Sequence, residues 1–336
     1  MRIRLVSYKD YYGHVSQDTV NEFENAIKAT NTSAQLTSSL SRVFGRRFLK
    51  KIMGYNKLPL AFLKRERIHK FCVIMGLEFY KCVLAFLFNR NNSIYFFDAW
   101  THNHGQIEWF IKLMGIKNVF FSSRQVTEMF RKKGLDCNFL WVPEGISVAD
   151  YRFKDYSKKD IDVLAFGRKY DAHHNKIVTG LQQKGISYLY EKTKGHIVFK
   201  DRLAFIDGLA RTKISICVPS DITHPERSGI ISTMTIRYLQ SMASKTLIIG
   251  YMPEEMKSLF DYTPIVELDM DNPVQQITAI LDDFDSYIPL IEKNYRFVKE
   301  HHTWLNRWNV IRQTIAQSAG ITPQAPMTAL PPQKVL

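Results

Sequence analysis

Short apolar runs alternate with amphipathic segments along this chain, and the alternation restarts after the middle of the sequence. Apolar runs of this length, bounded by polar turns, are typical of buried strands. They lie at 2–8, 92–98, 118–123 and 138–143 in the first half, and at 162–167, 186–192, 213–220 and 246–250 in the second. Strands that alternate with helices form parallel sheets with helical crossovers. The sequence therefore predicts an α/β protein built from two doubly wound units.

The junction between the two units is expected near residues 150–158. There VPEGIS (142–147) closes the first unit and a polar, irregular stretch follows. The first domain would span 1–155 and the second 156–300. Residues 321–336 are rich in proline and offer little to pack, so we expect a disordered tail.

The most apolar window runs from Phe71 to Phe88 and is about as long as a short membrane span. Glu78 and Lys81 lie in its middle, and charges there are costly in lipid. The window is therefore expected to form a buried helix.

Charge and cysteine content indicate the compartment and the partners. Of the 336 residues, 46 are Lys or Arg and 32 are Asp or Glu, which gives a net charge of +14. This excess favours nucleotides, nucleic acid or an acidic membrane face as partners. The four cysteines form no CxxC pair, and the N-terminus shows no apolar signal region. These features favour a reducing, cytoplasmic location.

The stretch from Arg42 to Lys70 is densely basic and carries a single acid, Glu66. Apolar residues such as Phe44 and Phe48 interleave with the cations, a pattern typical of a basic amphipathic helix at a membrane surface. The alternative is an ordinary helix with a solvated basic face.

The segment PERSGIISTMTIRYLQSMASK (225–245) follows a predicted strand and leads into a helix. Ser232, Thr233 and Thr235 would lie at the start of that helix, where hydroxyls and unpaired backbone N–H groups form an anion site. Arg237 could add a charged bond to a phosphate, and Gln240 could bind a ribose hydroxyl. The alternative is simple capping of the helix by a hydroxyl, with Arg237 on a solvated face.

A second candidate site follows the strand DVLAFG (162–167). Gly167 at the strand end would let the backbone approach a ligand, and the cations that follow it suit a diphosphate. His173 and His174 are adjacent, so on a helix they point in different directions and are not expected to share a metal ion.

In the first half, His14 follows the first strand, and Asp98 and His102 follow the strand that ends at 98. An imidazole or a carboxylate in such a position could act as a base or orient a hydroxyl nucleophile. The alternative is a surface loop without a catalytic role. The chain has no GxGxxG, GxxxxGK[ST] or GxSxG motif, which argues against a dinucleotide oxidoreductase, a P-loop NTPase and a nucleophile-elbow hydrolase.

Three segments resemble the group-1 type of GT-B glycosyltransferase. LAFGRKYDAHHNK (164–176) is similar to the strand, Gly-Arg turn and downstream lysine of that family, and VPEGIS to the turn that closes its first domain. PSDITHPERSGIISTMTIRYLQSMASKTLIIG (219–250) resembles its donor-site signature, in which Glu226 and Gln240 match the two acids. The step between these two residues is longer than in the family. TIRYLQSMAS (235–244) and HTWLNRW (302–308) are closer to the spore-maturation-like branch.

The resemblance implies a fold and a set of roles. Two Rossmann-like domains would face a cleft, with a C-terminal helix at 301–320 crossing back to pack on the first domain. Arg168 and Lys176, with the helix start at Thr233, would hold the diphosphate of a nucleotide-sugar donor. Glu226 would contact the donor sugar and Gln240 the ribose. His14, Asp98 and His102 are the candidates for aiming the acceptor hydroxyl.

The implied activity is sugar transfer, with retention, from a nucleotide-sugar to a glycan or lipid-linked acceptor in surface polysaccharide or glycolipid biosynthesis. Cations and a helix dipole can carry the charge of the diphosphate, so neither a metal nor a further cofactor is expected. The basic segment would place the enzyme peripherally on the inner face of the plasma membrane. Two alternatives remain, a nucleotide-sugar epimerase of the same fold and a non-catalytic nucleic-acid-binding protein, although no nucleic-acid-binding motif is present.

Overall fold

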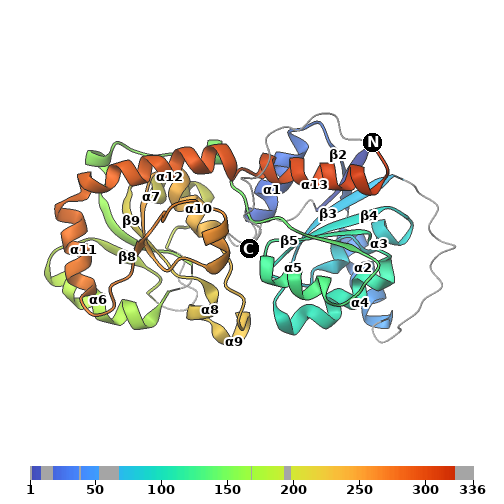
Figure 1. The fold of residues 1–336 in the computed structure, drawn as a ribbon, viewed down its shortest axis with the longest axis horizontal. Helices are drawn as coiled ribbons and strands as arrows, with labels where there is room; N and C mark the ends of the chain where they lie inside the picture. The colour runs from blue at the N-terminus through green and yellow to red at the C-terminus, as the bar shows by residue number, and fades with distance from the viewer. Residues whose placement is uncertain are drawn as a thin grey trace. The chain divides into compact units, whose positions relative to one another are not determined.

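The chain folds into two α/β units, each built on its own parallel sheet (Figure 1). The computed structural model describes residues 2–8, 18–37, 39–52, 68–167, 169–192 and 198–321. Unit 1 runs to Pro143 and also takes up the C-terminal helix from Trp304, whereas unit 2 spans Glu144–Thr303.

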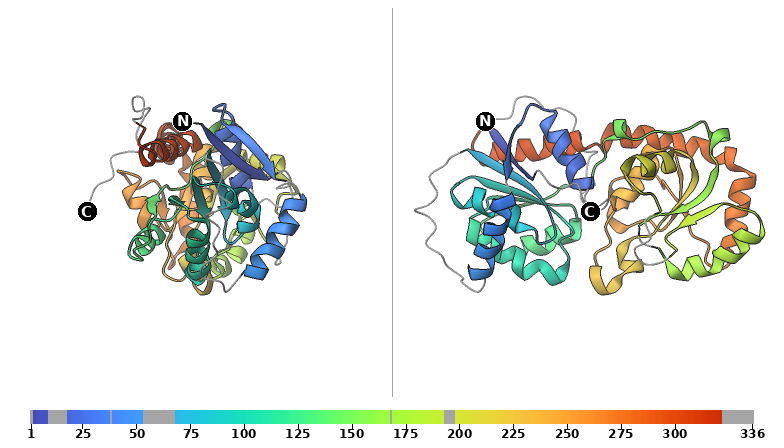
Figure 2. Two further views of the ribbon diagram at one scale, coloured as in Figure 1. Left: turned by 90° about the vertical axis from the view of Figure 1, so that its right-hand side faces the viewer. Right: turned by 180° about the vertical axis from the view of Figure 1, so that it is seen from behind.

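Unit 1 holds a six-stranded sheet in the order β2-β1-β3-β4-β5-β6, all parallel. Its strands are β1 (Ile3–Tyr8), β2 (Ser33–Thr37), β3 (His69–Met75), β4 (Asn92–Phe97), β5 (Asn118–Phe121) and β6 (Asn138–Trp141). Its α-helices are α1 (Asp18–Lys28), α2 (Ser39–Ile52), α3 (Val83–Leu87), α4 (His104–Met114), α5 (Arg124–Arg131) and α13 (Trp304–Ser318). Helices α1 and α13 pack together on one face of the sheet, opposite α2 to α5 (Figures 1 and 2).

Unit 2 holds a five-stranded parallel sheet in the order β11-β10-β9-β7-β8. Its strands are β7 (Ile161–Ala165), β8 (Tyr188–Tyr190), β9 (Thr212–Cys217), β10 (Leu247–Gly250) and β11 (Val266–Glu267). Its α-helices are α6 (Asp171–Gln183), α7 (Arg202–Ala210), α8 (Ser220–Thr223), α9 (Pro225–Ser228), α10 (Ile236–Ala243), α11 (Pro273–Asp282) and α12 (Ile288–His301).

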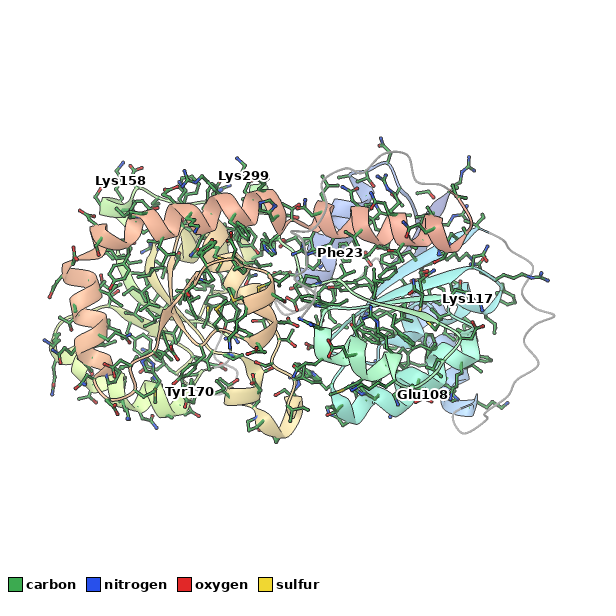
Figure 3. The ribbon with its side chains drawn as sticks, in the orientation of Figure 1. Phe23, Glu108, Lys117, Lys158, Tyr170 and Lys299 are labelled. Atoms are coloured by element: carbon green, nitrogen blue, oxygen red, sulfur yellow. The ribbon has the colours of Figure 1, made fainter. Side chains whose placement is uncertain are left out.

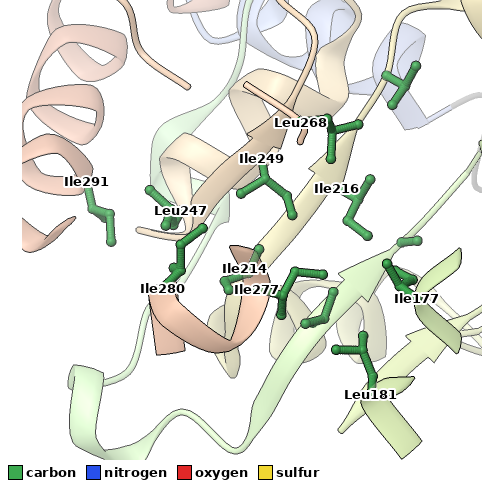
Figure 4. Packing of buried hydrophobic residues seen from close by; sticks show 13 residues of the cluster. Ile177, Leu181, Ile214, Ile216, Leu247, Ile249, Leu268, Ile277, Ile280 and Ile291 are labelled. Atoms are coloured by element: carbon green, nitrogen blue, oxygen red, sulfur yellow. The ribbon is translucent and has the colours of Figure 1, made fainter. Parts of the chain in front are cut away.

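Aliphatic side chains from the central strands and from α6 and α11 form the core of unit 2 (Figure 4). Ile214 and Ile249 come from β9 and β10, Ile177 from α6 and Ile277 from α11, and all four are fully buried. β-Branched residues favour the pleated backbone of these strands, and the crossover helices cover both faces of the sheet. Two α/β units with parallel sheets were predicted from the sequence, and this prediction is confirmed.

The window Phe71–Phe88 was predicted to be one buried helix, and that prediction is wrong. Its first part is β3, which pairs with β1 and β4, and the remainder contains a short 3-10 turn (Phe79–Lys81) and α3. A central parallel strand is apolar on both faces, so it reads as a continuous apolar run, and periodicity cannot separate it from a buried helix.

The sequence also predicts one helix over 287–308, but in the structure this helix is broken at His302 and Thr303, between α12 and α13. At the break, Ile146 N–H donates to the His302 carbonyl at 3.0 Å, and Ile146 pairs with Thr303 as an isolated bridge. The tail 322–336 lies outside the described residues, so its predicted disorder stays a prediction.

The start of α13 is fixed inside unit 1 by aromatic stacking and a buried guanidinium. Phe23 of α1 is labelled in Figure 3, and the Trp304 ring stacks on it with centroids 4.5 Å apart. Arg307, fully buried, donates from Nε to the Pro143 carbonyl at 2.9 Å. The HTWLNRW segment therefore anchors the residues that end unit 1.

Within the described residues, no helix is both long and apolar enough to span a membrane. Cys72, Cys82 and Cys217 are buried thiols, and Cys137 is half-buried. None of these four cysteines forms a disulfide bond.

Glu24 generates a pH prediction for unit 1. Its carboxylate is 3% exposed, accepts a hydrogen bond from Ser7 Oγ and lies 3.5 Å from Lys28 Nζ. Burial raises its pKa from 4.5 to about 7. The native state therefore binds more protons than the unfolded state between these two values, so this group's contribution to stability falls as the pH rises through the window.

We expect Glu24→Gln to remove this pH dependence. Relative to the variant, the wild-type free energy of unfolding should fall by about 2–3 kcal/mol between pH 5 and pH 8, at roughly 1.4 kcal/mol per pH unit across the window. Urea denaturation at the two pH values measures the difference. Parallel pH profiles for wild type and variant would contradict the assignment.

Candidate functional site

The start of α10 lies against the carboxyl ends of β7 and β9 in unit 2. In open parallel sheets, ligands bind beyond these strand ends. Arg237, in the first turn of α10, donates from Nη1 to the Phe166 carbonyl at 3.3 Å and from Nη2 to the Val218 carbonyl at 2.9 Å. These bonds use backbone acceptors that no neighbouring strand takes up, and they fix α10 to both strand ends.

Gly167 follows β7 and contacts Arg237 directly. Its φ is +74°, a region that favours glycine, and a Cβ there would lie 3.1 Å from Arg237 Cδ. The structure thus brings together Gly167 and Arg237, two of the residues predicted for phosphate binding. Arg168, the third residue of this turn, lies outside the described residues.

The loop before α10 carries the predicted hydroxyls. Thr233 Oγ1 and Thr235 Oγ1 are buried and have no hydrogen-bond partner among the described residues, while Ser232 is half-buried. Thr235 is the N-cap residue of α10, yet its side chain makes no capping bond. Between the two threonines, Met234 N–H donates to Glu255 Oε1 at 2.7 Å. The Met234 backbone therefore helps to hold the loop, whereas the hydroxyls of Thr233 and Thr235 do not.

Glu255 was missed by the sequence analysis. It lies in a 3-10 turn after β10 (Glu254–Ser258) and is 4% exposed. A pair of acids four and five residues after the end of a buried strand was visible in the sequence, but the distant partner of Glu255, the Met234 amide, was not.

Three further residues of the segment after β9 have buried polar atoms without a partner among the described residues. They are Ser220 Oγ, Asp221 Oδ1 and His224 Nδ1, from α8 and the residue that follows it. A buried polar atom without a partner costs about 1–3 kcal/mol. With the two threonines they make five such atoms on the segment between β9 and α10, and we call this set the β9–α10 polar cluster. Sequence analysis placed a ligand site on this segment but did not single out these three residues.

The remaining donor-site candidates of unit 2 have different surroundings. Gln240 is buried and donates from Nε2 to Tyr151 Oη at 3.1 Å. Lys176, exposed on α6, donates to the Met270 carbonyl at 2.6 Å. Glu226 is exposed on α9. The roles assigned to these side chains from the resemblance stay predictions.

The unit 1 candidates lie after β4. Asp98 follows the strand directly, with a φ of +49°, and is half-buried, while His102 is exposed in a 3-10 turn (Thr101–Asn103). Nearby, burial lowers the pKa of His104, whose Nε2 lies 3.0 Å from the Ala99 carbonyl. His14 lies outside the described residues.

Among the residues with described positions, no group of three or more His, Cys, Asp or Glu side chains could hold a metal ion.

The β9–α10 polar cluster generates a stability prediction. Thr233→Val removes a buried hydroxyl that has no partner, so the free energy of unfolding should stay unchanged or rise. Thr212→Val is the matched control, because the equally buried Thr212 Oγ1 donates to the Gly208 carbonyl at 2.7 Å. The control should lose about 1–2 kcal/mol. Urea denaturation of both variants checks this, and an equal loss for both would show that Thr233 has a partner in the folded chain.

Solved structures share this fold at low sequence identity. A glycosyltransferase from Rickettsia africae matches with a TM-score of 0.58 and 11% identity, over 95% of this chain and 98% of that one. HepE from Anabaena, in complex with UDP and glucose, gives a TM-score of 0.58 at 9% identity, over 94% and 100% of the two chains. A sucrose-phosphate synthase from Thermosynechococcus elongatus gives 0.61 at 11% identity, over 95% and 99%. No family model matches the chain, and no curated protein gives a significant match.

A candidate UDP-N-acetylglucosamine 2-epimerase from Listeria monocytogenes also matches, with a TM-score of 0.50 and 10% identity over 98% of this chain and 100% of that one. Proteins with similar structures thus include one named as a glycosyltransferase and one named as a candidate epimerase. Identities this low establish the fold alone. The chain has two Rossmann-like units of the GT-B fold, as its sequence predicted.

Proposed function

We propose that this protein is a nucleotide-sugar-dependent glycosyltransferase whose unit 2 binds the donor. The β9–α10 polar cluster carries the proposal. Its five buried atoms lie on the loops that follow β9, at the sheet edge where ligands bind in this fold class, and each lacks a partner among the described residues. A nucleotide-sugar, with its hydroxyls and phosphate oxygens, can supply the missing hydrogen bonds.

Charge favours the same class of ligand. The chain carries a net charge of +14, and the start of α10 directs backbone N–H groups and the positive end of the helix dipole toward the cluster. In the proposed site, the helix start at Thr233 and Lys176 hold the donor diphosphate, with Arg168 as the sequence predicts. Gln240 binds the ribose and Glu226 the sugar.

The proposed chemistry needs little covalent machinery. The leaving diphosphate is stabilised by cations and helix N–H groups, and no metal is invoked. An acceptor hydroxyl from a glycan or a lipid-linked sugar is oriented in unit 1 by Asp98 and His102, with His14 as the sequence predicts. We propose transfer with retention, in the assembly of a surface polysaccharide or a glycolipid.

A thermal-shift screen tests the donor proposal. A ligand that binds only the native state raises the melting temperature by mass action, by an amount equivalent to about 2.7 kcal/mol at a ligand concentration of 100 Kd. We expect UDP, GDP or ADP, or one of their sugar conjugates, to raise it. If none of them shifts the melt while DNA or RNA oligonucleotides do, the protein is a nucleic-acid-binding protein and the proposal fails.

The variants Thr233→Val and Thr212→Val locate the binding site within unit 2. In Thr233→Val, most of the nucleotide-induced rise in melting temperature should be lost. In Thr212→Val, the rise should be kept, although the melting temperature without ligand should be lower than that of the wild type. Equal shifts for both variants would place the donor away from the β9–α10 polar cluster.

Epimerisation of a nucleotide-sugar is the second candidate function, since the candidate epimerase from Listeria monocytogenes has a similar structure. Product analysis separates the two reactions. An epimerase converts the nucleotide-sugar without an acceptor, whereas a transferase releases free nucleoside diphosphate in step with glycosylated product.

We further propose that α2 docks the protein peripherally on an anionic membrane, on the inner face of the plasma membrane. The helix exposes Val43 and Phe44, the latter at 57%, beside the exposed cations Arg46, Arg47 and Lys51. Apolar side chains beside cations suit the interface of an anionic bilayer. Residues 53–67 of the predicted basic segment lie outside the described residues. Its last cation, Lys70, is not on a helix surface, because it is buried in β3 and donates to the Ala85 carbonyl.

Vesicle flotation tests the docking proposal. At low salt, vesicles that contain phosphatidylglycerol should recover the protein, and neutral phosphatidylcholine vesicles should not. Phe44→Ser should reduce recovery severalfold because it removes the exposed aromatic ring, whereas Leu203→Ser, which changes the exposed apolar side chain of α7, should not. Equal recovery on neutral and anionic vesicles would exclude electrostatic docking.

A further inference from the structure

His173 continues the buried face of α6 toward the carboxyl end of the sheet. Ile177 and Leu181, one and two turns further along α6, belong to the core formed with β7 and β9. His173 is only 1% exposed, although it lies in the first turn of the helix. Its ring therefore lies near the end of β7, where Gly167 follows the strand.

The two adjacent histidines of α6 differ in their hydrogen bonding. His174 Nδ1 lies 3.1 Å from Tyr188 Oη, and its ring packs on Tyr190. His173 Nε2 is buried and has no partner among the described residues. A structural histidine in a packed core normally has a partner for its buried nitrogen, because an unmade bond is costly. Burying His173 Nε2 without a hydrogen bond therefore lowers the stability of the folded chain, and no hydrogen bond from the described residues offsets this loss.

The groups around His173 suit an anion. The α6 start at Asp171 follows Tyr170 directly (Figure 3), and the first turn of the helix presents backbone N–H groups that have no partner within the helix. Two cations flank the ring in sequence, Lys169 and Lys176. Lys169 Nζ lies 3.2 Å from Asp171 Oδ1, and Lys176 is bound to the Met270 carbonyl.

The His173 ring is neutral at physiological pH. Burial, together with smaller effects of the neighbouring His174 and Lys176, lowers its pKa to about 4. A neutral imidazole has one N–H donor and one acceptor nitrogen. In the tautomer that protonates Nε2, it offers a fixed, uncharged donor to a phosphate oxygen.

We propose that His173 binds the diphosphate of the donor, with Nε2–H donating to a phosphate oxygen held at the start of α6. This inference rests on the proposed function, because it assigns one more contact to the same donor. The hydrogen bond from His173 to the phosphate would then be the same across neutral pH, where a histidine with an ordinary pKa would change its charge.

The test compares His173→Leu with His174→Leu in the full chain, using UDP, GDP and ADP as probes. His173→Leu removes a nitrogen without a partner, so the ligand-free melting temperature should stay the same or rise, while the dissociation constant of the bound nucleotide should increase about tenfold. His174→Leu breaks the bond to Tyr188, so the melting temperature should fall while the dissociation constant stays within about twofold. Calorimetric titration and thermal melts measure the two quantities.

His173→Gln keeps an amide N–H donor and provides a second variant if the leucine variant fails to fold. It should bind nucleotide within about threefold of wild type. An unchanged dissociation constant in His173→Leu, or a tenfold loss in both His173→Leu and His173→Gln with a lowered melting temperature, would overturn the assignment and leave the donor proposal intact. Wild-type protein that binds none of the three diphosphates would overturn both.

Discussion

The organisation of unit 2 depends on the way Arg237 joins two strand ends. Its guanidinium binds the carbonyls of Phe166 and Val218, which extend beyond the hydrogen-bonded parts of β7 and β9. A guanidinium has five N–H donors in a fixed plane, so it can hold several backbone acceptors at once. The side chain passes close to Gly167, where a Cβ would lie 3.1 Å from Arg237 Cδ, and the φ of +74° at this position also favours glycine. The interaction fixes the start of α10, and with it the loop that carries Thr233 and Thr235.

The carboxyl end of the sheet in unit 2 holds more buried polar atoms without partners than its amino end. At the amino end, the buried Lys159 ammonium donates to the carbonyls of Ala210, Thr212 and Ser244, and Ser244 Oγ is the atom there that has no partner among the described residues. At the carboxyl end, the β9–α10 polar cluster and His173 bury polar atoms without partners. The number of such atoms on the segments that follow β7 and β9 supports the proposed donor site, because a polar ligand can supply the missing hydrogen bonds. The net charge of +14 supports an anionic ligand.

The sequence could indicate part of the candidate site but not all of it. A strand followed by glycine, or by hydroxyls at a helix start, is a local pattern, so Gly167, Thr233 and Thr235 could be predicted as candidates. Glu255, which fixes the Met234 amide, comes from another loop 21 residues away, and only the fold brings the two together. Asp221 and His224 were likewise ordinary loop residues until the structure showed that their polar atoms are buried without partners. Arg237 was predicted at the site on the basis of its helix position, yet its contacts with two backbone carbonyls depend on tertiary structure.

The sequence alone determined the α/β class, two parallel sheets and most of their strands, because hydrophobic periodicity and turn residues act locally. It failed at β3, where burial on both faces removes the alternation that distinguishes a strand, and at β2, whose short and largely exposed run gives little signal. Tertiary structure alone decided that the chain breaks at His302 and Thr303, since the Ile146 backbone competes there for the hydrogen bonds of a continuous helix. It also decided which histidine of the adjacent pair found a partner. His174 meets Tyr188 of a neighbouring strand and His173 meets none among the described residues, a difference that depends on packing across the fold and not on either residue's local sequence.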